Sequence, residues 1–267
     1  MRKGGMIADG LPDWILPLLG APFVGSLLGV LIRRLPARRP ILWARSQCES
    51  CGHSLSAAEL VPIASWLILR GRCRTCRAPI SLFHPAVEVA AIGVAGWAVA
   101  QEWHALDRTA LVWSDCLLGW PLLALAWIDW QHLRLPDALT LPLLLAGLVV
   151  TCWLTPATAT EHAAAAAAGY VAFRAIDWFY RRLRGRAGLG QGDAKLMAAA
   201  GAWLGLSALP LVATSGAMIG IVWSLARAAV EIVRRPGKIQ RSRLLAGTVV
   251  PFGPCLALAI WLVWLYG

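Results

Sequence analysis

The chain contains 267 residues, of which 58% are hydrophobic and 15% are charged, and its formal net charge is +11. This composition excludes an ordinary soluble domain and is typical of a protein that crosses a membrane several times. Lys and Arg collect in the cytoplasmic loops of such proteins, so the positive charge does not by itself indicate nucleic-acid binding.

About eight segments are long and apolar enough to be membrane-spanning helices. The first ends at Arg33 and Arg34 and has no clear small-residue cleavage site, so we expect a retained helix rather than a removed signal peptide. In chain order, the predicted spans are 14–32, 86–101, 110–128, 138–154, 161–180, 195–209, 211–233 and 248–265. Only Pro210 separates 195–209 from 211–233, so a tight re-entrant turn or one kinked element is an alternative there.

Lys and Arg are concentrated in segments that eight spans would place on one side of the membrane. These segments are 33–85, 129–137, 181–195 and 234–247. The opposite side holds little more than Arg2, Lys3 and Arg108. The positive-inside rule therefore predicts that the basic side is cytoplasmic and that both termini lie on the other side.

The first basic segment contains two C-x-x-C pairs, in CESCGHS (48–54) and GRCRTCR (71–77). Two such pairs about twenty residues apart match a tetrahedral four-thiolate site, to which each pair contributes two sulfur ligands. The predicted ligands of a structural Zn²⁺ are Cys48, Cys51, Cys73 and Cys76. A rubredoxin-like iron site and disulfides are the alternatives, but an odd count of 7 cysteines argues against a disulfide framework.

Aspartates at the cytoplasmic ends of predicted spans are functional candidates, because an ionisable group is costly there. Asp129 ends one span, where its charge opposes the helix dipole, and Asp193 begins another. Two carboxylates at the same depth on different helices suit an aspartyl protease, in which one activates water and the other, protonated, polarises the scissile carbonyl. Asp137 is expected mainly to cap the next helix, and Asp193 as a helix cap is the structural alternative to catalysis.

The residues around Asp193 are predicted to support it. Gly190 and Gly192 lack side chains, so an extended substrate backbone could approach Asp193 closely. Lys195 could pair with an acid or reach a lipid headgroup. The other functions considered are a proton-coupled transporter and a non-enzymatic zinc-bearing scaffold. The first would need acids near mid-membrane, whereas these acids lie at one edge.

Taken together, these motifs resemble the type IV prepilin peptidases. The resemblance rests on CESC…CRTC, on DWQHLRLPDALTLPLLLAGL (129–148) and on GLGQGDAKLMAAAGAWLG (188–205), with GSLLGVLIRRLP (25–36), HPAVE (84–88) and PFGPCLALA (251–259) in support. It covers nearly the whole chain. It departs from the family pattern at Glu49, where a proline usually follows the first cysteine.

The resemblance implies a G-x-G-D aspartyl protease of the bacterial cytoplasmic (inner) membrane, with Asp129 and Asp193 as its catalytic pair. It implies that the substrates are type IV prepilins or type II secretion pseudopilins, which are cut after a glycine behind a short basic leader. It also implies methylation of the new N-terminal residue with S-adenosylmethionine. The segment 33–85 contains no glycine-rich fingerprint for this donor, so a peptidase without methyltransferase activity is the alternative.

We therefore expect an all-α polytopic membrane protein with about eight transmembrane helices and a small cytoplasmic zinc-binding loop domain. The predicted domains are an N-terminal segment with the first helix (1–32), the four-Cys metal-binding domain (33–85) and the aspartyl protease core (86–267). The expected partners are the pilin-like substrates and the lipid bilayer, and no nucleic acid.

Overall fold

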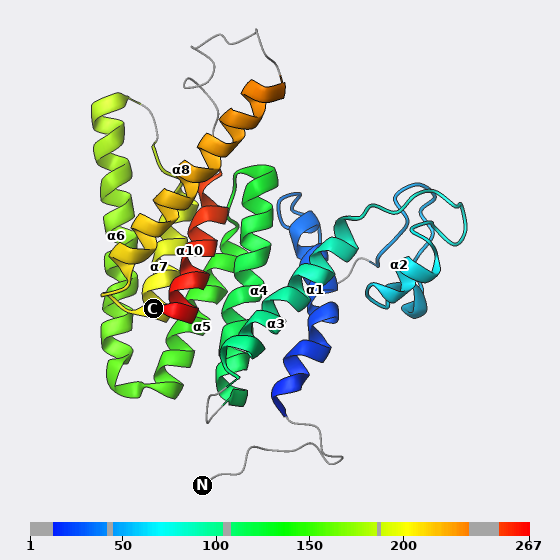
Figure 1. Ribbon diagram of the computed structural model, residues 1–267, viewed down its shortest axis with the longest axis horizontal. Helices are drawn as coiled ribbons and strands as arrows, with labels where there is room; N and C mark the ends of the chain where they lie inside the picture. The colour runs from blue at the N-terminus through cyan, green and yellow to red at the C-terminus, as the bar shows by residue number, and fades with distance from the viewer. Residues whose placement is uncertain (1–12, 42–44, 104–107, 186–187, 235–250) are drawn as a thin grey trace. The chain divides into compact units, whose positions relative to one another are not determined.

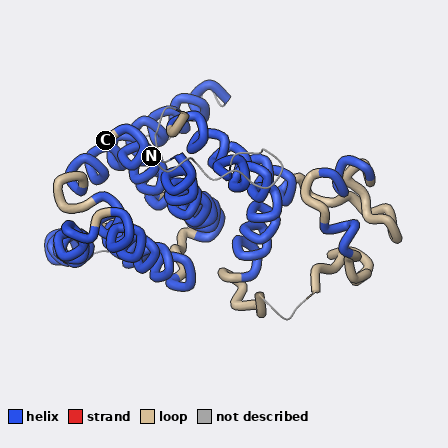
Figure 2. Tube along the Cα trace, turned by 90° about the horizontal axis from the view of Figure 1, so that it is seen from below, coloured by secondary structure: helices blue, strands red, loops and turns tan. Residues whose placement is uncertain are grey.

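Figure 1 shows the computed structural model of the protein, which describes residues 13–41, 45–103, 108–185, 188–234 and 251–267. Within these ranges the backbone forms α-helices, short 3-10 helices and connecting segments, without a β-strand (Figure 2). The predicted all-α class is therefore confirmed. The basic segment predicted over 234–247 lies, except for its first residue, outside the described residues.

Each predicted span overlaps one helix of the described chain, although the helix over 191–204 begins and ends earlier than the predicted span 195–209, and 248–250 lie outside the described residues. These helices are α1 (Leu16–Arg34), α3 (Phe83–Gln101), α4 (Arg108–His132), α5 (Asp137–Leu154), α6 (Ala159–Arg184), α7 (Gln191–Leu204), α8 (Leu209–Arg234) and α10 (Phe252–Tyr266). Helices α1, α3, α4, α5 and α8 are long and apolar enough to cross a membrane, and α10 is a shorter apolar helix. The short helices are η1 (Asp13–Ile15), η2 (Ala57–Leu60), α2 (Ala64–Ile68) and η3 (Pro156–Thr158).

The chain divides into two compact units, Met1–Ala124 and Leu125–Gly267, and the boundary falls within α4. In the first unit α1 packs against α3. A Cβ at Gly25 of α1 would lie 2.6 Å from the Cα of Glu88, so glycine is needed for this close approach. The Trp120 indole N–H donates to the Ala91 carbonyl at 3.1 Å and ties α4 to α3. The predicted domain boundaries stay a prediction.

Helix α7 is the central helix of the second unit, where it packs against α5, α6 and α10 (Figure 1). From Asp193 to Trp203, all its residues except Lys195 are buried. Most of them are Ala or Gly, which lets neighbouring helices approach closely. A Cβ at Gly201 would lie 2.5 Å from the backbone of Ala165 in α6. Helix α7, which is short and rich in small residues, is therefore a buried core helix of this unit.

Candidate active site and metal centre

Asp129 lies near the end of α4, and the residue is only 6% exposed. Its Oδ2 accepts a 2.9 Å hydrogen bond from the backbone N–H of Gly253, in the first turn of α10. A Cβ at Gly253 would lie 2.6 Å from that oxygen. Glycine at this position therefore allows α10 to approach the carboxylate. Gly253 was not among the predicted site residues, although a glycine between Pro251 and Pro254 at a helix start is an unusual local pattern.

Asp193 lies in the first turn of α7, and the residue is 7% exposed. Its Oδ2 accepts a 3.0 Å hydrogen bond from the backbone N–H of Gly190, which is the N-cap residue. The carboxylate thus closes the first turn, as in a capping box. The charge of Asp129 also acts on the Asp193 carboxyl group, so the fold brings the two acids into one site. Capping and a shared acidic site are both present.

The two predicted supporting glycines are packed against groups of the protein itself. A Cβ at Gly192 would lie 2.6 Å from the Cβ of Leu135, in the connection between α4 and α5. A Cβ at Gly190 would lie 2.9 Å from Oδ2 of Asp193. Both glycines therefore let the α4–α5 connection and the Asp193 carboxylate approach the start of α7.

Lys195 and Asp137 form an ion pair between the first turn of α7 and the first residue of α5. Of the two roles open to Lys195 from the sequence, the structure shows pairing with an acid. Asp137 does not take the predicted N-cap position, because α5 begins one residue earlier than expected and Pro136 occupies that position without a side-chain cap. The Asp137 carboxylate is instead in the first helical turn, where it suits the helix dipole and faces Lys195.

Asp177 of α6 holds the chain that leads into α7. The residue is 3% exposed and accepts hydrogen bonds at 3.3 Å from the backbone N–H groups of both Gly188 and Leu189. It also forms ion pairs with Arg174 at 3.7 Å and with Arg181 at 2.9 Å. The two arginines lie three and four residues from Asp177 along α6, whereas the contact with the chain before Gly190 joins α6 to a separate segment. Asp177 is thus a positioning residue for the loop that leads into α7, the helix that carries Asp193.

We expect Asp177→Ala to loosen this loop and to lower leader cleavage by about tenfold, because two partly buried N–H groups, of Gly188 and Leu189, lose their acceptor. Asp177→Asn keeps one oxygen acceptor and should retain more activity than the alanine variant. The measurement is hydrogen exchange of the Gly188 and Leu189 amides, which should become faster in Asp177→Ala. A general loss of helix stability would not single out these two amides. Unchanged protection of these amides in Asp177→Ala would contradict the positioning role.

The four predicted cysteine ligands lie together in the first unit, with all their Sγ atoms within 4.8 Å of one another. The two C-x-x-C turns have matching backbones. In the first, the Gly52 N–H donates to the Cys48 carbonyl at 2.9 Å; in the second, the Arg77 N–H donates to the Cys73 carbonyl at 3.0 Å. Gly52 and Arg77 both have positive φ, at 70° and 62°. Two equivalent knuckles therefore face each other and can hold a metal ion.

The knuckle backbone favours thiolates. The N–H groups of Cys51 and Ser50 lower the pKa of the Cys48 thiol to about 6. In the second knuckle, the N–H groups of Cys76 and Thr75 lower the pKa of Cys73 in the same way. Negative sulfurs this close together need a cation between them, and four thiolates fit a tetrahedral metal with no open position.

The chain is similar to known proteins of one family. The family description "Bacterial Peptidase A24 N-terminal domain" matches residues 18–102, and "Type IV leader peptidase family" matches residues 116–225. The prepilin leader peptidase/N-methyltransferase of Aeromonas hydrophila is 35% identical over 98% of this chain and 94% of its own length. The chain belongs to the type IV leader peptidase family. The protein of the same name from Stutzerimonas stutzeri is 34% identical over 91% of this chain and 87% of its own length. The one from Burkholderia pseudomallei (strain 1026b) is 43% identical over 84% of this chain and 67% of its own length.

Membership of the type IV leader peptidase family confirms the resemblance inferred from the motifs. Both aspartates lie in the part matched by the leader peptidase description, residues 116–225. The four cysteines lie in the part matched by the N-terminal domain, residues 18–102. Gly253 lies outside both matched ranges. No solved structure matches the chain.

Proposed function

We propose that this protein is a membrane-embedded aspartyl endopeptidase that removes the basic leader of type IV prepilins or type II secretion pseudopilins. We also propose that it methylates the new N-terminus with S-adenosylmethionine. The names of its relatives support both activities. The single observation that carries the peptidase activity is the buried pair of carboxyl groups on α4 and α7, Asp129 and Asp193.

Asp129 and Asp193 are the proposed catalytic residues. One of them, ionised, takes a proton from a water molecule whose oxygen attacks the scissile carbonyl. The other, protonated, donates a hydrogen bond to the carbonyl oxygen. Neighbouring carboxylates share a proton in this way because two like charges side by side repel. The proton taken from water passes to the leaving amine as the C–N bond breaks.

One backbone N–H positions each of the two acids. Gly253 donates to Oδ2 of Asp129 at 2.9 Å, and Gly190 donates to Oδ2 of Asp193 at 3.0 Å. We therefore assign the remaining oxygen of each carboxyl group, Oδ1, to the water and the scissile carbonyl. Because both donors belong to helix starts, the carboxyl groups keep their orientation without a further side chain.

We place the protein in the bacterial cytoplasmic (inner) membrane, with the acids and the cysteine cluster on the cytoplasmic side. The concentration of Lys and Arg in the loops supports this orientation, and the last turn of α6 carries three basic residues of that group, Arg181, Arg182 and Arg184. A lipid bilayer also accounts for the apolar side chains exposed on α5, such as Leu145, Val149 and Trp153, which are 59%, 67% and 77% exposed.

We propose that the four-cysteine cluster holds a Zn²⁺ ion. Its residues fit this ion because four mutually close sulfurs form a closed tetrahedral shell. With no open coordination position, the ion would be structural and would cross-link the two knuckles. It would take no part in peptide cleavage.

Metal analysis of the gently purified protein should therefore find about one Zn²⁺ per chain. Cys73→Ser should lose this ion, because Cys73 is a buried member of the cluster. Cys152→Ser is the matched control, since Cys152 lies in α5 outside the cluster and should leave the zinc content unchanged. Iron in place of zinc, or no bound metal at all, would contradict the proposal.

The proposed function is tested by incubating the purified protein with a prepilin and an isotope-labelled methyl donor. Cleavage is followed by the change in the mass of the pilin, and methylation by label in its N-terminal residue. We expect both signals. Cleavage without label would support the alternative of a peptidase that lacks methyltransferase activity, and the absence of both would reject the proposal.

A further inference from the structure

Residues 46–82 form a knuckle module between α1 and α3, which contains the two cysteine knuckles and the short helices η2 and α2. One hydrogen bond fixes the depth of this module along the membrane helices. The backbone N–H of Ile63, the residue before α2, donates to Oε2 of Glu88 in α3 at 2.7 Å. Glu88 in turn lies against Gly25 of α1, where a Cβ would be 2.6 Å from its Cα. The start of α2 is therefore level with Gly25 and Glu88.

This level lies below the proposed cytoplasmic ends of α1 and α3. At 1.5 Å per residue, Gly25 is about 13.5 Å along the axis from Arg34, the last residue of α1. Glu88 is about 7.5 Å along the axis from Phe83, the first residue of α3. Both helices are long and apolar enough to cross a membrane. The knuckle module thus lies beside the end turns of two membrane helices, at the depth of the bilayer boundary.

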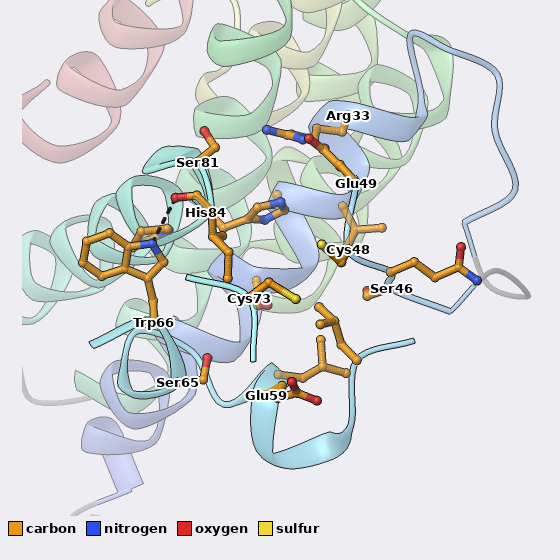
Figure 3. Close-up of a pocket in the computed structure, with 18 of the residues that line it drawn as sticks. Arg33, Ser46, Cys48, Glu49, Glu59, Ser65, Trp66, Cys73, Ser81 and His84 are labelled. Atoms are coloured by element: carbon orange, nitrogen blue, oxygen red, sulfur yellow. Dashed lines mark hydrogen bonds and ion pairs between the residues drawn. The ribbon is translucent and has the colours of Figure 1, made fainter. Parts of the chain in front are cut away.

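A cavity of about 650 Å³ lies between the module, α1 and α3 (Figure 3). Its lining runs along α1 from Ser26 to Arg33, which agrees with the depth set by Glu88. Figure 3 shows Arg33 and Glu49 on one side of the cavity and Ser65 and Glu59 on the opposite side. Irregular backbone is tolerated at membrane depth where it lines a cavity of this kind.

The outer side of α2 is apolar and exposed. Trp66 and Leu69, three residues apart, line the cavity, whereas Leu67 and Ile68 lie outside the lining and are 61% and 80% exposed. Three further large apolar side chains of the module are exposed, namely Leu60, Val61 and Leu82. Leu82 directly precedes α3, so the exposed apolar residues continue onto a membrane helix. Exposed apolar residues gathered in this way mark an interaction surface.

The charges of the module indicate what covers this surface. Between Glu59 and Glu88 the chain contains four arginines and no acidic residue. These arginines are Arg70, Arg72, Arg74 and Arg77, and all four are exposed. Apolar side chains next to arginines are typical of a segment at the headgroup boundary of an anionic bilayer. The same arginines would repel the basic leader of a prepilin, so the bilayer is the better partner.

We propose that α2 and the residues beside it lie in the cytoplasmic leaflet of the bilayer and bind anionic phospholipid. Leu67 and Ile68 contact the acyl chains, and Arg70 and Arg72 contact the phosphate groups. The module that carries the four cysteines is then attached to the membrane surface along its length and not only through α1 and α3. This inference goes beyond the proposed function and depends on neither of the two proposed activities.

The test uses the full-length protein in bilayers that contain anionic phospholipid, with a fluorescent amino acid at position 68. Ile68 is 80% exposed, so the replacement leaves the packing of the module intact. The matched control is the same fluorophore in place of Ser54, an exposed residue of the first knuckle. Phospholipids brominated on their acyl chains should quench position 68 at least about threefold more than position 54, because interfacial segments sink into the acyl boundary. Equal quenching at the two positions would overturn the proposal.

Photocrosslinking identifies the group that covers the surface. A benzophenone amino acid at position 67 or 68, in protein reconstituted together with a prepilin, should form adducts with phospholipid. Adducts with the prepilin instead would show that the surface binds substrate and would overturn the proposal. The double variant Arg70→Gln/Arg72→Gln should lower the yield of phospholipid adducts about threefold in anionic bilayers and leave it unchanged in neutral ones. An unchanged yield in anionic bilayers would contradict the contact of these arginines with phosphate.

Discussion

Asp129→Asn and Asp193→Asn are each expected to abolish leader cleavage while the protein still inserts into the membrane. An amide cannot take a proton from water or pass one to the leaving amine, and with one carboxyl group replaced the two residues can no longer share a proton. The loss should be at least about a thousandfold, because the two acids act as a unit and neither can replace the other. The measurement is the mass of a co-expressed prepilin, with the amount of enzyme in the membrane fraction determined in parallel.

The control for these variants is Glu161→Gln, which changes an exposed acid in the first turn of α6. It should cleave the substrate at the wild-type rate. Because Asp and Asn have nearly the same shape, both catalytic variants should keep the hydrogen bonds to Gly253 and Gly190 through their remaining side-chain oxygen. Normal processing of the prepilin by either catalytic variant would reject the paired-acid mechanism.

Gly253→Ala is expected to lower leader cleavage by at least about a hundredfold, because the added methyl group would meet the Asp129 carboxylate at 2.6 Å. That contact is too short for a Cβ, so either the carboxyl group turns away or α10 moves and takes its N–H with it. Both responses remove the 2.9 Å hydrogen bond that positions Asp129. The rate of cleavage at saturating substrate is the quantity to measure.

A matched glycine substitution separates this local effect from a general loss of helix packing. Gly220→Ala in α8 should leave activity nearly unchanged, because the nearest atom to its new Cβ is the Cys255 Sγ at 3.8 Å, an ordinary van der Waals distance. Thermal unfolding of both variants in detergent should show similar midpoints. Full activity in Gly253→Ala would mean that Asp129 does not need this backbone donor for cleavage.

Metal binding and leader cleavage use different units of the chain. The acids for peptide cleavage belong to the second unit, whereas the cysteine cluster belongs to the first. Variants of the cysteine cluster are therefore expected to change the metal content while leader cleavage continues. This division also agrees with the two family descriptions, which match residues 18–102 and 116–225 separately.

The sequence by itself predicted the helices, the family and the cysteine cluster. The longest apolar runs became the helices α1, α3, α4, α5 and α8, because the hydrocarbon core of a bilayer demands a continuous apolar segment with internal hydrogen bonds. Residues close together in the sequence are enough to meet this demand. The cysteine cluster could also be predicted from local sequence. Each C-x-x-C pair forms its own turn and needs only the other pair to complete four ligands. An ionised side chain at the end of a span costs free energy, and for this reason the sequence indicated Asp129 and Asp193 as functional candidates.

Only the tertiary structure decided which groups hold those acids. The donor to Asp129 comes from Gly253, which is 124 residues away in the chain, and the anchor of the loop before Asp193 comes from Asp177 on another helix. The pairing of Asp137 with Lys195 and the use of Gly192 to admit Leu135 are also contacts between separate elements. The periodic pattern of apolar residues predicts helices but not such contacts. These contacts depend on which backbone N–H groups and side chains meet once the helices have packed.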